Sequence, residues 1–249
     1  MSSPTEQTRI LVATAGGFLR NVIRETGVTC SICATPVYGG YVTCYRCSMN
    51  GAHADIVVPL SYAIQGRQSG TTMRHYKDDG SADVRRRLSA VVQRALFVGL
   101  VRHQRCIENI VGQQVNRRMA IPSSNGRRGV HPFIAIAQQM NAVAESPRLV
   151  PAEGDFGREV TASRFLVDPP DTRFDGEHVL ILDDTWTTGS RTQSAALLLR
   201  RLGAAHVSVM TVARWVDPNW NQNASFIRTR LANDFDPDRC PVTGTSCPV

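Results

Sequence analysis

Hydrophobic and polar positions divide the chain into short apolar runs that alternate with amphipathic segments. The runs have the length and composition of strands and lie at residues 55–63, from Met119, and at residues 148–152, 163–167, 178–182 and 206–214. Apolar residues recur at helical spacing from residue 84 to about residue 114, at residues 133–143, and between the last two runs up to Gly203. Strands that alternate with helices in this way predict an α/β fold.

The same pattern predicts a Rossmann-like, mostly parallel sheet with helices on both faces. The run HVLIL at residues 178–182 is apolar throughout, which is typical of a central strand. Residues 67–83 are polar and contain glycine, so a loop is expected there, and residues 18–23 are expected to form a short buried helix. Ligands of such sheets bind at the carboxyl ends of the strands.

Length and composition bound the number of folded units. A chain of 249 residues with 42% hydrophobic residues can bury one substantial core and carry one small module. No apolar run approaches the roughly 18 residues that a membrane helix needs. Residues 10–19 resemble the apolar part of a signal peptide, but Glu6 and a single arginine precede them. We therefore expect a cytoplasmic protein with no membrane partner.

The net charge of +7 favours an anionic partner. A nucleic acid, a phosphorylated metabolite and the anionic cytoplasm all satisfy this condition. Lys77 is the only lysine, so nearly all the basic residues are arginines. The planar guanidinium group of arginine suits two-point contacts with phosphate.

Four cysteines near the start of the chain predict a metal site. Cys30, Cys33, Cys44 and Cys47 form two C-x2-C pairs separated by ten residues. Each pair can direct two thiolates at one point, and two pairs complete a tetrahedral zinc site without an open position. Bound zinc would stabilise the small ribbon by on the order of 10 kcal/mol. Two disulfides are the alternative, which conflicts with the expected compartment.

The ribbon is expected to occupy residues 1–52 together with an N-terminal helix. Its aromatic and basic residues leave open a role in nucleic-acid binding: Tyr38, Tyr41, Tyr45 and Arg46. An α/β domain is expected at residues 53–235 and a C-terminal tail at residues 236–249. Cys106 is expected to be a small buried residue of a helix, and Cys240 and Cys247 to belong to a loose tail, with a metal clip or a disulfide as alternatives.

The most specific signal lies at residues 179–190, VLILDDTWTTGS. An apolar strand is followed by Asp183 and Asp184 and then by a hydroxyl-rich turn that enters a helix. Backbone N–H groups, the positive end of the helix and three hydroxyls can hold a phosphate in this turn. The carboxylates would then accept hydrogen bonds from sugar hydroxyls or help to hold hydrated Mg2+. A sugar phosphate satisfies both halves of the pattern.

Two other interpretations of these acids explain less of the pattern. A Walker B strand needs a P-loop with a glycine before its lysine, but the only lysine, Lys77, follows Tyr76. A helix cap formed by Asp184 would explain one carboxylate and leave the hydroxyl cluster unexplained.

Residues 179–190 resemble the signature of type I phosphoribosyltransferases, in which two acids and a T-T-G-S/T loop bind 5-phosphoribosyl 1-pyrophosphate (PRPP). The four-cysteine ribbon, a D-x-x-x-P-L-x-Y-like segment at residues 55–62 and a basic loop before the signature resemble the competence protein F class of that superfamily. The resemblance covers about residues 18–215. It implies the type I phosphoribosyltransferase fold with a small N-terminal zinc ribbon.

The resemblance also implies roles for individual residues. Asp183 and Asp184 match the catalytic acids that contact the ribose hydroxyls. The predicted PRPP-binding residues are Thr185, Thr187, Thr188, Gly189, Ser190, Ser123, Arg127, Arg128 and Gly129, of which the last three resemble the basic part of the family's pyrophosphate loop. His131 lies where the family has a polar residue. Trp186 and Arg191 are larger than the usual residues, and residues 152–165 match the family's mobile loop poorly, with Arg158 and Arg164 as its only basic residues.

The implied activity is a Mg2+-dependent phosphoribosyltransferase that transfers the phosphoribosyl group of PRPP to a nitrogen nucleophile and releases pyrophosphate. The acceptor is not evident from the sequence. The alternative is a PRPP-binding protein without turnover, with a regulatory or nucleic-acid-associated role.

Overall fold

The computed structural model describes residues 3–123 and 130–248. Its elements, in chain order, are α1 (Pro4–Ala15), α2 (Tyr45–Asn50), β1 (Ile56–Ile64), α3 (Gln68–His75), α4 (Ala82–Val111), β2 (Arg117–Ala120), α5 (Pro132–Gln139), β3 (Arg148–Pro151), the 3-10 turn η1 (Ala162–Arg164), β4 (Phe165–Asp168), β5 (His178–Trp186), α6 (Ser190–Arg201), β6 (His206–Val216) and α7 (Asn223–Arg230).

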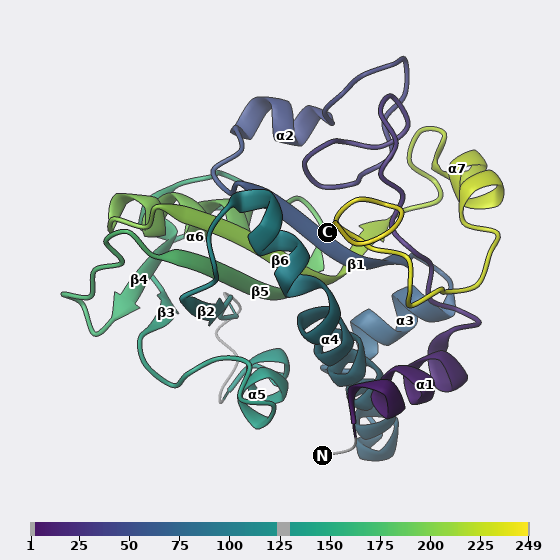
Figure 1. Cartoon of the computed structure of the whole chain (residues 1–249), viewed down its shortest axis with the longest axis horizontal. Helices are drawn as coiled ribbons and strands as arrows, with labels where there is room; N and C mark the ends of the chain where they lie inside the picture. The colour runs from purple at the N-terminus through teal and green to yellow at the C-terminus, as the bar shows by residue number, and fades with distance from the viewer. Residues whose placement is uncertain (1–2, 124–129, 249) are drawn as a thin grey trace.

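A four-stranded parallel sheet lies at the centre of the molecule (Figure 1). Its strand order is β1-β6-β5-β2, and every neighbouring pair is parallel. Leu182 of β5 is opposite Met210 of β6 on one side and Ala120 of β2 on the other. The predicted α/β class, the parallel sheet and the inner position of the HVLIL strand are therefore confirmed.

Alternate residues of the strands pack into two separate cores. Leu180 and Leu182 of β5 point to the face that is covered by α1, α3, α4 and α5. Val179 and Ile181 point to the other face, which is covered by α6 and the cysteine-containing N-terminal segment. This alternation is the two-residue period of a strand buried on both sides.

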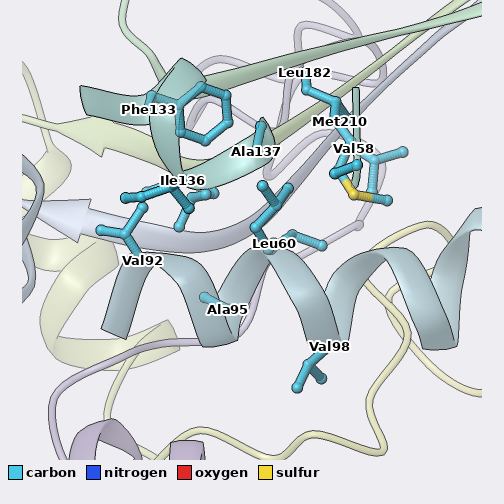
Figure 2. Packing of buried hydrophobic residues seen from close by; sticks show 14 of the residues in the cluster. Val58, Leu60, Val92, Ala95, Val98, Phe133, Ile136, Ala137, Leu182 and Met210 are labelled. Atoms are coloured by element: carbon cyan, nitrogen blue, oxygen red, sulfur yellow. The ribbon is translucent and has the colours of Figure 1, made fainter. Parts of the chain in front are cut away.

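The 30-residue helix α4 provides most of the cover on the first face. Its side chains Val92 and Ala95 pack toward β1 and β6 beside α5 (Figure 2). The side chain of Ser81 accepts a hydrogen bond from the Val84 N–H at its start, and Gly112 ends it in a left-handed conformation. A side chain at Gly99 would overlap Leu60 of β1, so glycine allows the helix to approach the sheet closely.

Two sequence predictions of secondary structure were wrong. The N-terminal helix is α1, not residues 18–23: Ser3 and Pro4 start α1, and Gly16 follows its last residue. Residues 18–23 are irregular, although Leu19, Val22 and Ile23 are buried. The expected loop at residues 67–83 contains α3. The exposed face of α3 is polar and its buried residues are mostly small or hydroxyl-bearing, so the segment has no apolar pattern that would predict a helix.

The short strands β3 and β4 do not join the parallel sheet. They pair with each other in an antiparallel hairpin, with Leu149 opposite Val167. Apolar periodicity predicts a strand but not its partner, so the sequence could not distinguish a separate hairpin from a sheet edge. The hairpin packs against α6 through β4 and η1.

Both ends of the chain pack onto the sheet domain. Ile23 joins Tyr62 and Phe226 of α7 in a third small core, and the cysteines of the N-terminal segment share a core with β1. The C-terminal segment is not loose, because Cys240 and Val242 are buried in the core under α4. The division into units at residues 52 and 235 stays a prediction.

None of the helices within residues 3–123 and 130–248 has both the length and the apolar character needed to cross a bilayer.

Candidate functional site

The two acids of the signature lie inside strand β5, not after it. The sequence predicted that this strand ends at Leu182, but pairing with β6 continues to Trp186, which is opposite Arg214. The strand continues through these polar residues because β6 provides backbone hydrogen-bond partners along the whole length of β5. Since neighbouring residues of a strand point to opposite faces, Asp183 lies on the α6 side and Asp184 on the α3 side.

Asp184 is buried and already has two partners. Its Oδ2 atom accepts a hydrogen bond of 2.5 Å from the Tyr76 hydroxyl and forms an ion pair with the ammonium group of Lys77. Tyr76 and Lys77 directly follow α3, which places them beside the end of β5. Burial alone would raise the pKa of the Asp184 carboxyl, but Lys77, Tyr76 and the nearby His131 outweigh it and lower the pKa. Asp184 is therefore a stable carboxylate.

Asp183 has the opposite electrostatic character. Its Oδ1 atom accepts a hydrogen bond of 2.9 Å from the Asp184 backbone N–H. Burial, and then the charge of Asp184, raise the pKa of the Asp183 carboxyl to about 7, although Arg191 and Lys77 act against this. Two adjacent acids thus have strongly different proton affinities, and only Asp183 titrates near neutral pH.

The turn after β5 leads directly into α6. Gly189 is its last residue and adopts a left-handed conformation with φ of 77°. A side chain at Gly189 would overlap the indole of Trp186, so glycine is required for both the backbone angle and the space. No described side chain caps α6, so the N–H groups of its first turn remain available to a ligand. The hydroxyls of Thr188 and Ser190 lie 3.2 Å apart at this helix end.

The end of β2 lies beside the acids. The Ile121 N–H donates to the carbonyl of Leu182, so Pro122 and Ser123 continue along the edge next to Asp183. Arg191 of α6 donates to the carbonyl of Pro122 and thereby connects the start of α6 to the segment after β2. Ser123 therefore lies at the same edge as the acids. The predicted residues Arg127, Arg128 and Gly129 lie outside the described residues.

His131 follows that segment and starts α5. Its Nδ1 atom accepts a hydrogen bond of 3.3 Å from the Phe133 N–H, and its charge contributes to the lowered pKa of Asp184. His131 thus lies near Asp184 at the start of α5. The structure brings cationic or titratable groups toward Asp184 from both α3 and α5.

The other residues of the signature differ in burial and in their contacts. Trp186 is buried in the core of the α6 face, and its indole packs against Gly189 of the turn. The Oγ1 atom of Thr185 is buried and has no hydrogen-bond partner among the described residues. Thr187 is exposed at the tip of the turn.

Arg164 is a structural residue. It is buried, and its guanidinium donates to the carbonyls of Phe156, Gly157 and Glu159 within residues 152–164. This segment connects β3 to β4 and is tied to α6 through the Thr161 N–H, which donates to the Ser194 hydroxyl over 3.1 Å. Arg158 is exposed. The segment is thus held in place by its own arginine.

The D-x-x-x-P-L-x-Y-like segment joins parts of the fold. Asp55 forms an ion pair of 2.6 Å with Arg200 of α6 and accepts a hydrogen bond from the Val207 N–H. Tyr62 is fully buried in β1, and its hydroxyl donates to the carbonyl of Ala34 in the ribbon. None of these partners of Asp55 and Tyr62 is Asp183 or Asp184, and the contacts stabilise the fold.

The four cysteines of the ribbon come together as predicted. The sulfur atoms of Cys30, Cys33, Cys44 and Cys47 all lie within 4.8 Å of one another, and those of Cys33 and Cys44 are 3.8 Å apart. Zinc–sulfur bonds of about 2.3 Å place tetrahedral ligands about 3.8 Å apart, so the group fits zinc. Four thiolates leave no open position, which fits a structural ion and not a catalytic one.

Arg214 connects this cluster to the turn after β5. Its Nε donates to Thr35 Oγ1 over 2.6 Å, and its Nη1 donates to the carbonyls of Trp186 and Thr187, each over 2.7 Å. Thr35 Oγ1 lies 3.0 Å from the sulfur of Cys33. One buried side chain therefore sets the position of the turn relative to the cysteine cluster.

The aromatic residues of the ribbon have different surroundings. The hydroxyl of Tyr38 donates to Asn223 of α7 over 2.6 Å, which is a structural contact. Tyr41 and Tyr45 are exposed. Only these two aromatic residues remain accessible for the nucleic-acid role that the sequence left open.

Sequence reasoning missed Tyr76, Lys77 and Arg214. The signal for Lys77 was its identity as the only lysine among 28 basic residues, but that identity did not indicate its partner. Arg214 and Tyr76 gave no signal, because each is defined by partners that are distant in the chain.

Comparisons with known proteins give weak likenesses. No family model matches the chain, and no curated protein matches it. Among solved structures, a purine phosphoribosyltransferase from Pyrococcus horikoshii Ot3 is similar over 53% of this chain and 89% of its own, with 15% identity and a TM-score of 0.28. The UMP synthase of Leishmania donovani is similar over 58% of this chain and 28% of its own, with 22% identity and a TM-score of 0.24. Both TM-scores are below 0.5, so the fold assignment rests on the sheet topology of this chain.

Proposed function

We propose that the chain is a phosphoribosyltransferase that uses PRPP and Mg2+ and transfers the phosphoribosyl group to a nitrogen nucleophile. One observation carries the proposal. Two acids near the end of an inner parallel strand are followed by the last two residues of that strand, a three-residue turn and a helix N-terminus without a side-chain cap. Ligands of open parallel sheets bind at this end of the strands.

The 5-phosphate of PRPP would bind the turn. The first N–H groups of α6, the Thr188 and Ser190 hydroxyls and the close backbone at Gly189 offer donors without a Cβ in the way. Arg191 brings a positive charge to the same end of the helix. The turn therefore favours a doubly charged anion.

The ribose would bind beside the acids. Carboxylate oxygens accept hydrogen bonds from neighbouring hydroxyls, and Asp184 stays ionised because Lys77 pairs with it. When the 2- and 3-hydroxyls of the ribose replace Lys77 as partners of Asp184, the ammonium group of Lys77 becomes available for the pyrophosphate oxygens. Lys77 would thus act first as the partner of the acid and then as a partner of the leaving group.

Carboxylate oxygens are ligands that Mg2+ takes, and Asp183 loses its proton near neutral pH, so the donors present fit the ion. Bound Mg2+ supplies charge neutralisation for pyrophosphate. The reaction forms a bond from the anomeric carbon to nitrogen and breaks the bond to pyrophosphate, which leaves with its electron pair. The nucleophile loses its proton to water. The chain's own residues contribute by orienting the ribose and by placing cations near the leaving group.

A PRPP-binding protein without turnover is the second candidate, and one observation favours it. Residues 152–164 are held by the buried Arg164, whereas closure over the reacting bond needs a segment that moves. Such a protein would keep the phosphate turn and the acids but release no pyrophosphate.

The test combines binding with turnover. We expect the full chain with Mg2+ to bind PRPP by calorimetry and to release pyrophosphate with at least one member of a panel of nucleobases and amines. The double variant Asp183→Asn, Asp184→Asn should lose binding and keep its fold and zinc, while Asp171→Asn, in an exposed loop, should behave as wild type. Binding without release on any panel member would support the second candidate. Normal binding by the double variant would refute the site.

A further inference from the structure

A second group of metal-ligating side chains lies outside the ribbon and the proposed PRPP site. His103 and Cys106 lie one turn apart on α4, and Cys240 and Cys247 lie in the C-terminal segment. Their ligand atoms all lie within 4.8 Å of one another. We infer that His103, Cys106, Cys240 and Cys247 form a second structural zinc site that fastens the C-terminal segment to α4.

The distances fit a tetrahedral ion. The Nδ1 atom of His103 lies 3.7 Å from the sulfur of Cys247 and 4.0 Å from that of Cys106. Zinc bonds of about 2.0 Å to nitrogen and 2.3 Å to sulfur place such ligands about 3.5 Å apart, so small movements close the site. A Cys3His set is a regular ligand set for structural zinc.

The backbone around Cys240 repeats the turn around Cys30. The Cys30 N–H donates to the Thr35 carbonyl over 2.7 Å, and the Cys240 N–H donates to the Thr245 carbonyl over 2.7 Å. The fourth residue after each cysteine donates back to its carbonyl, from Ala34 over 2.9 Å and from Gly244 over 2.8 Å. Both of these residues have a positive φ, 57° at Ala34 and 85° at Gly244. The second cluster thus contains the same ligand-presenting turn as the ribbon.

Burial argues that the cluster needs an ion. Cys240 is 0% exposed, and His103 and Cys106 are each 4% exposed, so an imidazole and two thiols share a small volume with few alternative partners.

Two simpler roles account for less of the geometry. A disulfide would use two of the three cysteines and leave the third beside His103. Small buried residues would explain Cys106 but not the exposed Cys247, which lies at the open side of the group. With a second ion, all seven cysteines of the chain are ligands.

The C-terminal segment that the site would fasten also contacts the N-terminal part of the chain. The segment that carries Cys240 and Cys247 lies beside α4 and next to the N-terminal segment (Figure 1). Asn21 and Asp236 exchange hydrogen bonds of 2.7 Å and 2.8 Å, and the Phe235 N–H donates to Gly16.

Arg24 lies between the two clusters. Its guanidinium donates to the carbonyl of Ile32 in the ribbon turn and to that of Pro241 in the C-terminal turn. It is close enough to interact electrostatically with Cys30, Cys33 and Cys240. A partly buried cation at this place offsets the negative charge of two zinc–thiolate centres.

Metal content of the full chain tests the inference. Purified under reducing conditions, wild type should hold about two zinc ions per chain by mass spectrometry of the metal, as two closed ligand sets require. The double variant Cys106→Ala, Cys247→Ala and the variant Cys30→Ser should each hold about one, from different sites. Cys247→His keeps a zinc ligand at an exposed position and should hold both ions. Ser246→Ala, next to the exposed ligand, is the matched control and should also hold both.

Cobalt substitution gives a readout that does not depend on how well a variant folds. Wild type should show the visible bands of two tetrahedral sites with thiolate charge transfer, and X-ray absorption at the zinc edge should detect an imidazole ligand. One zinc per wild-type chain with three reactive thiols, a disulfide among Cys106, Cys240 and Cys247, or a double variant that keeps both ions would each overturn the inference.

Discussion

Lys77, the only lysine of the chain, forms an ion pair with Asp184 at the carboxyl end of the sheet. The two residues come from α3's end and from β5, and the Tyr76 hydroxyl binds the same carboxylate oxygen. The contact explains how a carboxylate can stay ionised where burial would favour its protonated form. It also sets the first prediction.

Replacement of Lys77 by methionine should destabilise the fold by about 3 kcal/mol, because Asp184 would be left as a buried charge without its ammonium partner. Chemical denaturation at pH 7.5 measures the change. Adding Asp184→Asn to Lys77→Met should recover most of the loss, since the charge is then removed. Arg74→Met, on the exposed face of α3, is the matched control and should change little. Equal losses in the single and double variants would contradict the pairing.

Asp183→Asn should stabilise the protein in alkaline solution. The pKa of Asp183 is raised from 3.8 to about 7, so ionising it costs folded-state free energy. The sign follows from proton binding: below about pH 4 both states are protonated and there is no cost, and the cost grows with pH until it is complete above about pH 7. We expect the variant's Tm to exceed that of wild type by several degrees at pH 8 and by less at pH 5.

The same raised pKa predicts the pH dependence of ligand binding. Mg2+ and PRPP hydroxyls require the carboxylate form, so affinity should fall as pH drops below about 7, and binding should release a proton. Calorimetry in buffers of different ionisation enthalpy detects that proton. Asp171→Asn should leave the release unchanged, whereas Asp183→Asn should abolish it.

Gly189→Ala should lower both stability and PRPP affinity. The new methyl group would meet the indole of Trp186 and would also force a side chain into a φ of 77°. Gly66 has the same φ of 77°, and no described atom lies within 4 Å of its Cβ position, so Gly66→Ala measures the backbone cost alone, about 1 kcal/mol. The excess loss at position 189 reports the contact with Trp186. Similar losses at both positions would show that Trp186 can move aside.

Arg214→Lys should weaken PRPP binding while zinc content stays the same. Lysine cannot contact Thr35 and the carbonyls of Trp186 and Thr187 together, so the turn would lose its fixed position. We expect a roughly tenfold lower affinity, equivalent to about 1.4 kcal/mol. Arg230→Lys, in an exposed ion pair with Glu25, is a matched control. Loss of zinc in Arg214→Lys would place its effect in the ribbon instead.

Sequence by itself determined the elements that depend on local patterns. Burial on both faces of the sheet requires the continuous apolar runs of β1, β5 and β6, and the helical spacing of apolar residues in α4 follows from the one face that packs on the sheet. The C-x2-C pairs predicted their own cluster, since each pair closes on itself within one turn. The turn after β5 was also a local pattern.

Only the tertiary structure decided which groups meet from distant parts of the chain. Tyr76 and Asp184 are 108 positions apart, and His103 and Cys247 are 144 positions apart. No local pattern carries such a pairing, because it depends on which helix covers which end of which strand. For the same reason the sequence placed Asp183 and Asp184 as an equivalent pair. Their different surroundings on the two sides of β5 lower the pKa of Asp184 and raise that of Asp183.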